Sequence, residues 1–172
     1  MRDQRFESIF QVAYVVEDID AAVTHWARVL GVGPFFVVRR QRYAECVYRG
    51  QPTDPEVSLA FAYSGDLNIE LVQLHDQAPS VFRDYVTAHG YGLQHVGCFA
   101  DDIAQASKDL AAAGVRELQR NVSTAGVETR FFDTELHPGA QLELIAATPE
   151  LRGRFAAMKA AAETWDGRKE SA

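Results

Sequence analysis

The sequence predicts an α+β fold made of two similar modules, followed by a C-terminal helix. Residues 11–19 and 95–103 form an internal repeat without a gap, each an apolar segment that ends in an aspartate and an isoleucine. A helix-forming stretch follows each copy and stops at a Gly-Val pair. The strand-like stretches that come next end in two similar sequences, Ile69-Glu70-Leu71-Val72 and Leu142-Glu143-Leu144-Ile145. This repeated order of strand, helix and strands indicates a duplicated unit.

The two repeated helices have recognisable start and stop signals. The first is expected over residues 21–30, after Asp18, and the second over residues 104–113, after Asp102. An aspartate at this position can accept a hydrogen bond from a free backbone N–H of the first turn. Gly31 and Gly114 follow the helices, where glycine readily adopts the left-handed conformation of a helix C-terminus.

The remaining elements follow from alternation and turn signals. Strands are expected over residues 35–42, 43–48, 57–63 and 68–74 in the first half and over 117–121, 128–133 and 141–145 in the second. The first module therefore covers residues 8–76 and the second 93–147, joined by a linker over 77–92 with a short helix at 81–88.

A last helix is expected over residues 149–165, before a disordered tail at 166–172. It places Leu151, Phe155, Met158 and Trp165 near one face, which favours packing on the body or on another subunit over a lid above the site.

Composition excludes several classes of function. A chain of 172 residues with 47% apolar residues can form one compact domain or two small modules that share a core. Its net charge of −7 gives no attraction for a phosphate backbone, so we expect no nucleic-acid partner. The sequence shows no signal peptide and no run of about 18 apolar residues, so we expect a cytoplasmic protein that does not cross a membrane. Cys46 and Cys98 are too few for a disulfide framework, although the sequence allows a single disulfide between them.

A basic cluster lies at residues 39–42 and includes Arg39, Arg40 and Arg42, with Arg49 following. It could meet a carboxylate or a phosphate of a substrate, but a solvated strand edge is the favoured interpretation.

Two carboxylates interrupt apolar strands and are the first candidate site residues. Because strand side chains alternate between faces, Glu70 points away from the side of its apolar neighbours, and so does Glu143. The apolar neighbours are expected to pack under the helices. A carboxylate in such a strand must be solvated, paired or bound to a metal, because an unpaired buried charge is costly.

The repeat links these carboxylates to two further polar residues. Gln11 and His95 occupy the same place in the two opening strands, and Glu70 and Glu143 the same place in the two closing strands. Each has an ordinary structural explanation alone, but duplication predicts that the four converge.

The sequences around these residues resemble glyoxalase I and methylmalonyl-CoA epimerase of the vicinal oxygen chelate superfamily, over roughly residues 8–146. The resemblance rests on Gln-Val-Ala-Tyr-Val-Val-Glu-Asp, Asn-Ile-Glu-Leu-Val, Gly-Leu-Gln-His-Val-Gly and Gly-Ala-Gln-Leu-Glu-Leu-Ile. It implies two βαβββ modules that form an open eight-stranded half-barrel around a metal.

The resemblance also implies a site. The metal ligands would be Gln11, Glu70, His95 and Glu143, a set similar to that of zinc-type glyoxalase I. Three oxygen donors and one nitrogen suit one divalent ion such as Zn, Ni, Co or Mn, with two positions left for water or substrate. Iron-dependent oxygenation is disfavoured, because it requires two histidines and this set supplies one. Glu143 is the first candidate for a catalytic base and Glu70 the second, in an isomerase or lyase that moves a proton beside a metal-bound oxygen.

The substrate is less well defined. Where glyoxalase I binds glutathione this chain has Val15, Leu74 and Tyr91, and where epimerases place a second catalytic carboxylate it has Leu59. These departures disfavour a glutathione conjugate and methylmalonyl-CoA itself as substrates. The substrate classes that stay open are an acyl-CoA and a small 2-oxo or 2-hydroxy compound. Some aromatic residues could line an apolar pocket, although a core role is favoured for them: Phe35, Tyr43, Phe61, Tyr63 and Phe132.

The alternative function is a ligand-sequestering protein similar to the bleomycin-resistance members of the superfamily. A homodimer is the expected assembly, and the four ligands could come from one subunit or from two. The other histidines are expected to be structural or exposed: His25, His75, His89 and His137.

Overall fold

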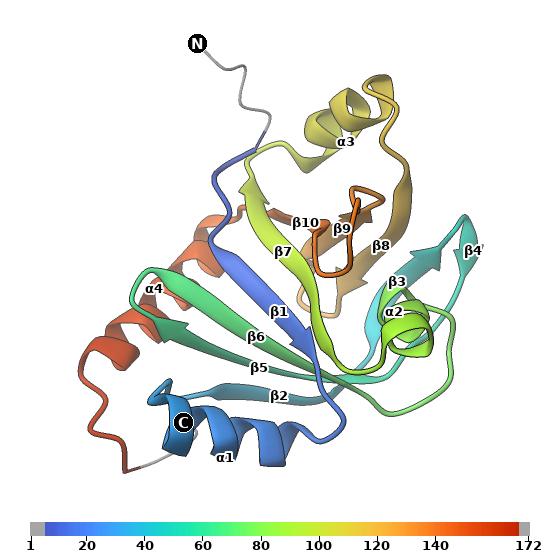
Figure 1. Ribbon diagram of the computed structural model, residues 1–172. Helices are drawn as coiled ribbons and strands as arrows, with labels where there is room; N and C mark the ends of the chain where they lie inside the picture. Colours follow the sequence, from blue (N-terminus) through green and yellow to red (C-terminus); the bar gives the residue numbers. More distant parts are fainter. Residues whose placement is uncertain (1–5, 169–172) are drawn as a thin grey trace.

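The computed structural model describes residues 6–168, which contain one strongly curled mixed sheet of ten strands and four helices (Figure 1). The strands are β1 (Gln11–Val15), β2 (Phe36–Gln41), β3 (Tyr43–Tyr48), β4 (Gln51–Pro52), β5 (Val57–Ser64), β6 (Leu67–Leu74), β7 (Gly92–Ala100), β8 (Glu117–Ser123), β9 (Glu128–Phe132) and β10 (Gln141–Ala146). The helices are α1 (Ile19–Leu30), α2 (Val81–His89), α3 (Ile103–Ala112) and α4 (Pro149–Glu163). The expected tail at 166–172 lies partly outside the described residues.

The sheet consists of two related halves that meet at its centre. Strands run in the order β2-β5-β6-β1 in one half and β7-β10-β9-β8 in the other, and β1 pairs with β7 in an antiparallel arrangement. Within each half the opening strand lies parallel to the closing strand, β1 beside β6 and β7 beside β10. The duplication seen in the sequence is therefore a duplication in space.

The expected count of eight strands is wrong, because β3 and β4 extend the sheet beyond β8. Only Arg42 separates β2 from β3, yet β2 pairs with β5 at one edge of the sheet and β3 pairs with β8 near the other. The β2 register breaks between Val38 and Gln41, where Arg40 has a positive φ of 48°. This bulge bends the strand, so the chain crosses from one edge to the other and brings the two edges together.

Helices α1 and α3 cover equivalent parts of the outer face. Asp18 accepts a hydrogen bond from the backbone N–H of Ala21, and Asp102 accepts one from Gln105, so both act as N-caps. Both helices begin slightly earlier than expected, at Ile19 and Ile103. The apolar neighbours of the two candidate glutamates pack beneath them as predicted: Ile69 and Leu71 with α1, Leu142 and Leu144 with α3.

Helix α4 packs on the body of its own chain. Phe155 lies in a cluster with Tyr63, Phe99 and Ile145. Ile145 is two residues from Glu143 and shares its face of β10, so α4 covers the inner face of the sheet. Ion pairs link the helix to the body, including one between Arg152 and Asp101 at 2.9 Å.

Two further expectations can be compared with the structure. Cys46 and Cys98 are both free and buried, so no bridge joins them. Among the described helices, none is long and apolar enough to cross a membrane.

Candidate metal centre and active site

The strand register places the four candidate ligands around one point of the inner face. Glu70 and His95 both pair with Ala13 of β1, from β6 and β7 respectively. Gln11 and Glu143 both pair with Gly97 of β7, from β1 and β10. In each of these two cross-strand rows, a very small residue, Ala13 or Gly97, lies between two candidate ligands. The register therefore places the four longer side chains on one face of the sheet, in two neighbouring rows.

The three ionisable members of the set form a tight buried cluster. The Nε2 atom of His95 lies 3.4 Å from Oε2 of Glu70 and 3.2 Å from Oε2 of Glu143. One ligand atom from each of the three side chains lies within 4.8 Å of the others. His95 is 1% exposed, Glu70 6% and Glu143 7%, so water alone does not solvate the two carboxylates. All three come from the same chain.

Two buried atoms of this site lack a hydrogen-bond partner among the described residues. They are Oε1 of Gln11 and Nε2 of His95. Buried polar atoms are nearly always satisfied, so an unsatisfied pair in one place calls for an explanation. Oε1 of Gln11 can donate a lone pair to a metal ion, and Nε2 of His95 can do so once a metal displaces its proton.

A second layer of side chains determines which atoms face the site. The Oε1 atom of Gln94 lies 2.6 Å from Nδ1 of His95, and Nε2 of Gln94 donates to Oε1 of Gln141 at 2.7 Å. Because an amide oxygen only accepts, Nδ1 carries a proton, and Nε2 is the ring nitrogen that faces the two carboxylates. The Nε2 atom of Gln11 donates to Oδ1 of Asn68 at 3.0 Å, which leaves Oε1 without a partner beside Gly97.

Burial and neighbouring charges shift the pKa values of the ionisable groups in the cluster. Burial raises the pKa of Glu70, and the nearby Glu143 carboxylate raises it further. Burial by itself lowers the pKa of His95, but the two carboxylates outweigh it and raise the pKa to about 9. Burial also raises the pKa of Tyr43, with contributions from both carboxylates, so this phenol stays protonated.

The donor set fits a divalent metal. Two carboxylates neutralise a charge of +2, and an imidazole and an amide oxygen complete a mixed set of nitrogen and oxygen ligands. The two atoms without partners are the ones that such an ion would satisfy.

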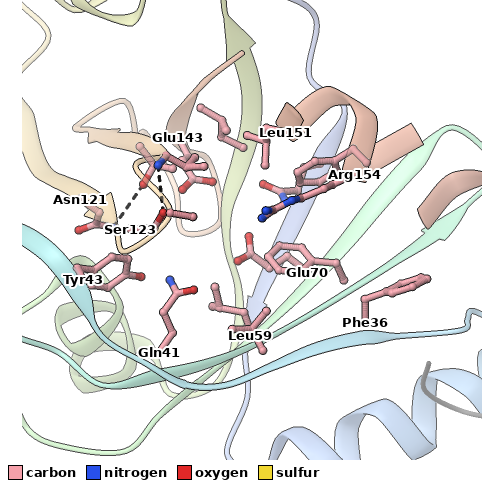
Figure 2. A pocket seen from close by; sticks show the side chains of 18 of the residues that line it. Phe36, Gln41, Tyr43, Leu59, Glu70, Asn121, Ser123, Glu143, Leu151 and Arg154 are labelled. Carbon is pink, nitrogen blue, oxygen red and sulfur yellow. Dashed lines mark hydrogen bonds between the residues drawn. The ribbon is translucent and has the colours of Figure 1, made fainter. Parts of the chain in front are cut away.

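A cavity of about 320 Å³ opens beside this cluster (Figure 2). Its walls are mostly apolar, and Gln11, Glu70 and Glu143 form part of its surface. Polar groups gather on the β8–β9 side, where Asn121 and Ser123 lie. Helix α4 forms another wall through Leu151, Arg154, Phe155 and Met158. The helix therefore packs on the body and also encloses the site.

The aromatic lining differs in part from the expectation. Tyr43 and Phe61 line the cavity, whereas Phe35, Tyr63 and Phe132 belong to core clusters. The sequence reasoning missed four aromatic lining residues: Phe36, Phe82, Phe131 and Phe155. Strand phase could have identified Phe131, since it pairs with Glu143 and so shares its face. Phe36 pairs with Phe61, which pairs with Glu70, and this register is not visible in the sequence.

The remaining candidates lie elsewhere. The arginines of the basic cluster form ion pairs with acidic residues and do not line the cavity, in agreement with a solvated strand edge: Arg39 with Asp20, Arg40 and Arg42 with Glu56, Arg49 with Asp84. His75 bonds Ser58 at 2.7 Å, and the other three histidines are exposed. Leu59 does line the cavity, where it presents an apolar side chain.

Comparison with known proteins identifies the family. Residues 10–134 match the model of the glyoxalase/bleomycin resistance protein/dioxygenase superfamily. The chain belongs to this superfamily, and the resemblance to vicinal oxygen chelate proteins is confirmed. No curated protein shows significant sequence similarity to the chain.

Solved structures share the fold at low sequence identity. Methylmalonyl-CoA epimerase from Mycobacterium tuberculosis has 22% identity and a TM-score of 0.60, over 89% of this chain and 96% of that one. A hypothetical protein from Bacillus halodurans has 15% identity and a TM-score of 0.60, over 82% and 94%. A variant of the Streptomyces coelicolor epimerase, in complex with 2-nitronate-propionyl-CoA, has 19% identity and a TM-score of 0.53, over 83% and 99%. At these identities the similarity shows the fold alone.

Proposed function

We propose that this chain is a metal-dependent isomerase or lyase that removes and returns a proton next to a metal-bound carbonyl or enediolate oxygen. One observation carries the proposal: Gln11 and His95 each present a buried atom without a hydrogen-bond partner, in a site that also holds Glu70 and Glu143. The four residues would hold one divalent ion, of which Zn, Ni, Co and Mn are the candidates. When bound, such an ion polarises a substrate oxygen and so acidifies the adjacent C–H.

The chain's own residues would carry out the proton transfer. Glu143 is the first candidate for the base, because its carboxylate reaches the cavity surface where a substrate would lie. Glu70 lies on the other side of the cluster, from the other half of the sheet, and could deliver a proton to the opposite face. Leu59 supplies no acid, so a two-base reaction would depend on this pair.

The cavity limits what can react. Its volume of about 320 Å³ accommodates a small acyl or 2-oxo group against apolar walls. An acyl-CoA could place only its acyl end there, and a small 2-oxo or 2-hydroxy compound could enter entirely. The similar epimerase in complex with 2-nitronate-propionyl-CoA makes the first class worth testing here.

The decisive experiment is deuterium incorporation from solvent into a panel of acyl-CoA, hemithioacetal and 2-hydroxy-ketone compounds, read by mass spectrometry. Glu143→Gln should abolish incorporation at the carbon next to the carbonyl and leave the thermal unfolding midpoint nearly unchanged. Glu150→Gln, at an exposed position outside the cavity, is the matched control and should exchange like the wild type. Undiminished exchange by the Glu143 variant would refute the assignment of the base.

The mostly apolar cavity also favours a second candidate, a ligand-sequestering protein without metal chemistry. Metal analysis after purification without added metal separates the two. About one tightly held divalent ion per chain supports the enzyme. A metal-free protein that still binds a bulky aromatic compound supports sequestration. We also propose a homodimer, which light scattering tests directly.

A further inference from the structure

Arg154 of helix α4 is a basic side chain at the cavity. Figure 2 shows it extending from the helix toward the space beside Glu70. Among the described residues that line the cavity, it is the only basic one. It forms no hydrogen bond or ion pair within residues 6–168, whereas Arg152, on the same helix, pairs with Glu7 and Asp101 outside the cavity. Its guanidinium group is therefore available to a ligand.

The helix holds Arg154 in a defined place. The ring of the adjacent Phe155 makes edge contacts with Phe10 at 5.5 Å, Phe99 at 5.5 Å and Phe61 at 5.9 Å between centroids. Ion pairs of Arg152 and Lys159 attach α4 to the body on either side of Arg154. A cation placed by a rigid element on the wall of a cavity can orient a ligand rather than merely attract it.

The charges of the site favour an anion with a single negative charge. The two carboxylates of Glu70 and Glu143 balance the charge of a divalent ion. With the ion bound, Arg154 therefore gives the cavity a net charge of +1. A carboxylate neutralises that charge, and its two oxygens match the planar donors of a guanidinium. A phosphate dianion would instead leave an excess negative charge beside two carboxylates.

We propose that Arg154 binds a carboxylate group of the substrate and so selects acids with an apolar body. Leu151, Phe155 and Met158, from the same helix, would contact that body. The inference deepens the proposed function by naming the substrate class, and it rests on that function only for the charge of the bound ion.

Isothermal titration with two probes of the same shape tests the proposal. The probes are 3-phenylpropionate and the neutral 3-phenylpropionamide, each titrated into the chelator-treated protein and into the protein with one equivalent of zinc. Wild type should bind the acid at least about tenfold more tightly than the amide, as expected for charge-assisted hydrogen bonds. Arg154→Gln should reduce this preference below about twofold, and Arg154→Lys should keep part of it.

Arg116→Gln is the control, because it removes the same charge outside both the cavity and α4, and it should keep the full preference. The preference is read in the metal-free protein as well, so a protein that takes up no metal would refute the proposed function without deciding this inference. A wild type that does not prefer the acid, or binds neither probe, overturns the inference. So does an Arg154→Gln variant that keeps the preference.

Discussion

Gly97 is the residue whose enlargement should damage the site most directly. A Cβ atom added there would lie 2.3 Å from Oε1 of Gln11, 3.0 Å from its Cβ and 3.1 Å from its Cδ. Real Cβ contacts are essentially never below 3.0 Å. Rotation of the Gln11 side chain relieves the first contact but not the one to its Cβ, so β1 and β7 must also separate slightly. Gly97→Ala should therefore cost about 1–3 kcal/mol of folding free energy through overpacking.

The same substitution should weaken metal binding, because it displaces an oxygen that we assign as a ligand. We expect a loss of roughly 10–100-fold in zinc affinity, the range seen when a ligand is mispositioned. Urea denaturation measures the first effect and competition with a chromogenic chelator the second. Gly153→Ala, at an exposed helical position with open space around it, is the control and should raise stability by about 0.5–1 kcal/mol.

A double variant separates the clash from other causes. Gln11→Ala removes the atoms that the new methyl group would meet, apart from the Cβ. The loss of stability caused by Gly97→Ala should therefore be smaller in a Gln11→Ala background than in wild type. Equal losses in the two backgrounds, or a Gly97→Ala protein with wild-type stability and zinc affinity, would contradict this reasoning.

Three other predictions follow from the described contacts. Gln94→Ala should lower zinc affinity roughly 10–100-fold, because it releases the imidazole of His95. Gln94→Glu should keep much of the wild-type affinity, because a carboxylate also accepts a hydrogen bond from Nδ1. If wild type and Gln94→Ala bind zinc equally tightly in a chelator competition, Gln94 has no such role. Burial raises the pKa of Cys46 to about 12 and that of Cys98 to about 11, so at pH 8 both thiols should react with a disulfide reagent far more slowly in the folded protein than in urea; comparable rates would contradict their burial. Phe155→Ala should cost about 3–5 kcal/mol, because it removes three ring contacts that hold α4, and a loss below about 1 kcal/mol in urea denaturation would show that α4 is not held in this way.

Much of the fold could be predicted because the signals are local. The caps at Asp18 and Asp102 and the alternation around Glu70 and Glu143 depend on residues close together in the chain. The position of β3 could not be predicted in this way. Alternation identifies a strand but not its partner, and the partner of β3 is β8, about 75 residues away in the pairing of Cys46 with Asn121. The extra strands and the closure between the two edges depend on that pairing.

The candidate site was accessible from the sequence for a different reason. The repeat relates Gln11 to His95 and Glu70 to Glu143, and a duplicated fold brings equivalent positions around one axis. Arg154 has no counterpart in the repeat, because α4 follows the second module. Its place at the cavity depends on how the helix packs on the inner face, which the sequence does not specify.

The structure extends the repeat to the residues that hold the candidate ligands in place. Asn68 stands two positions before Glu70, and Gln141 two positions before Glu143. Asn68 accepts a hydrogen bond from Gln11, and Gln141 accepts one from Gln94.

In each half, then, an amide from the closing strand fixes the residue of the opening strand, directly in the first half and through Gln94 in the second. The two halves differ in what they present: an amide oxygen from Gln11 and an imidazole nitrogen from His95. A symmetric scaffold with unequal donors gives the two glutamates unequal surroundings, since Glu70 shares a cross-strand row with His95 and Glu143 shares one with Gln11. That inequality is what a proton-transfer site needs if one carboxylate is to act as the base and the other to complete the exchange.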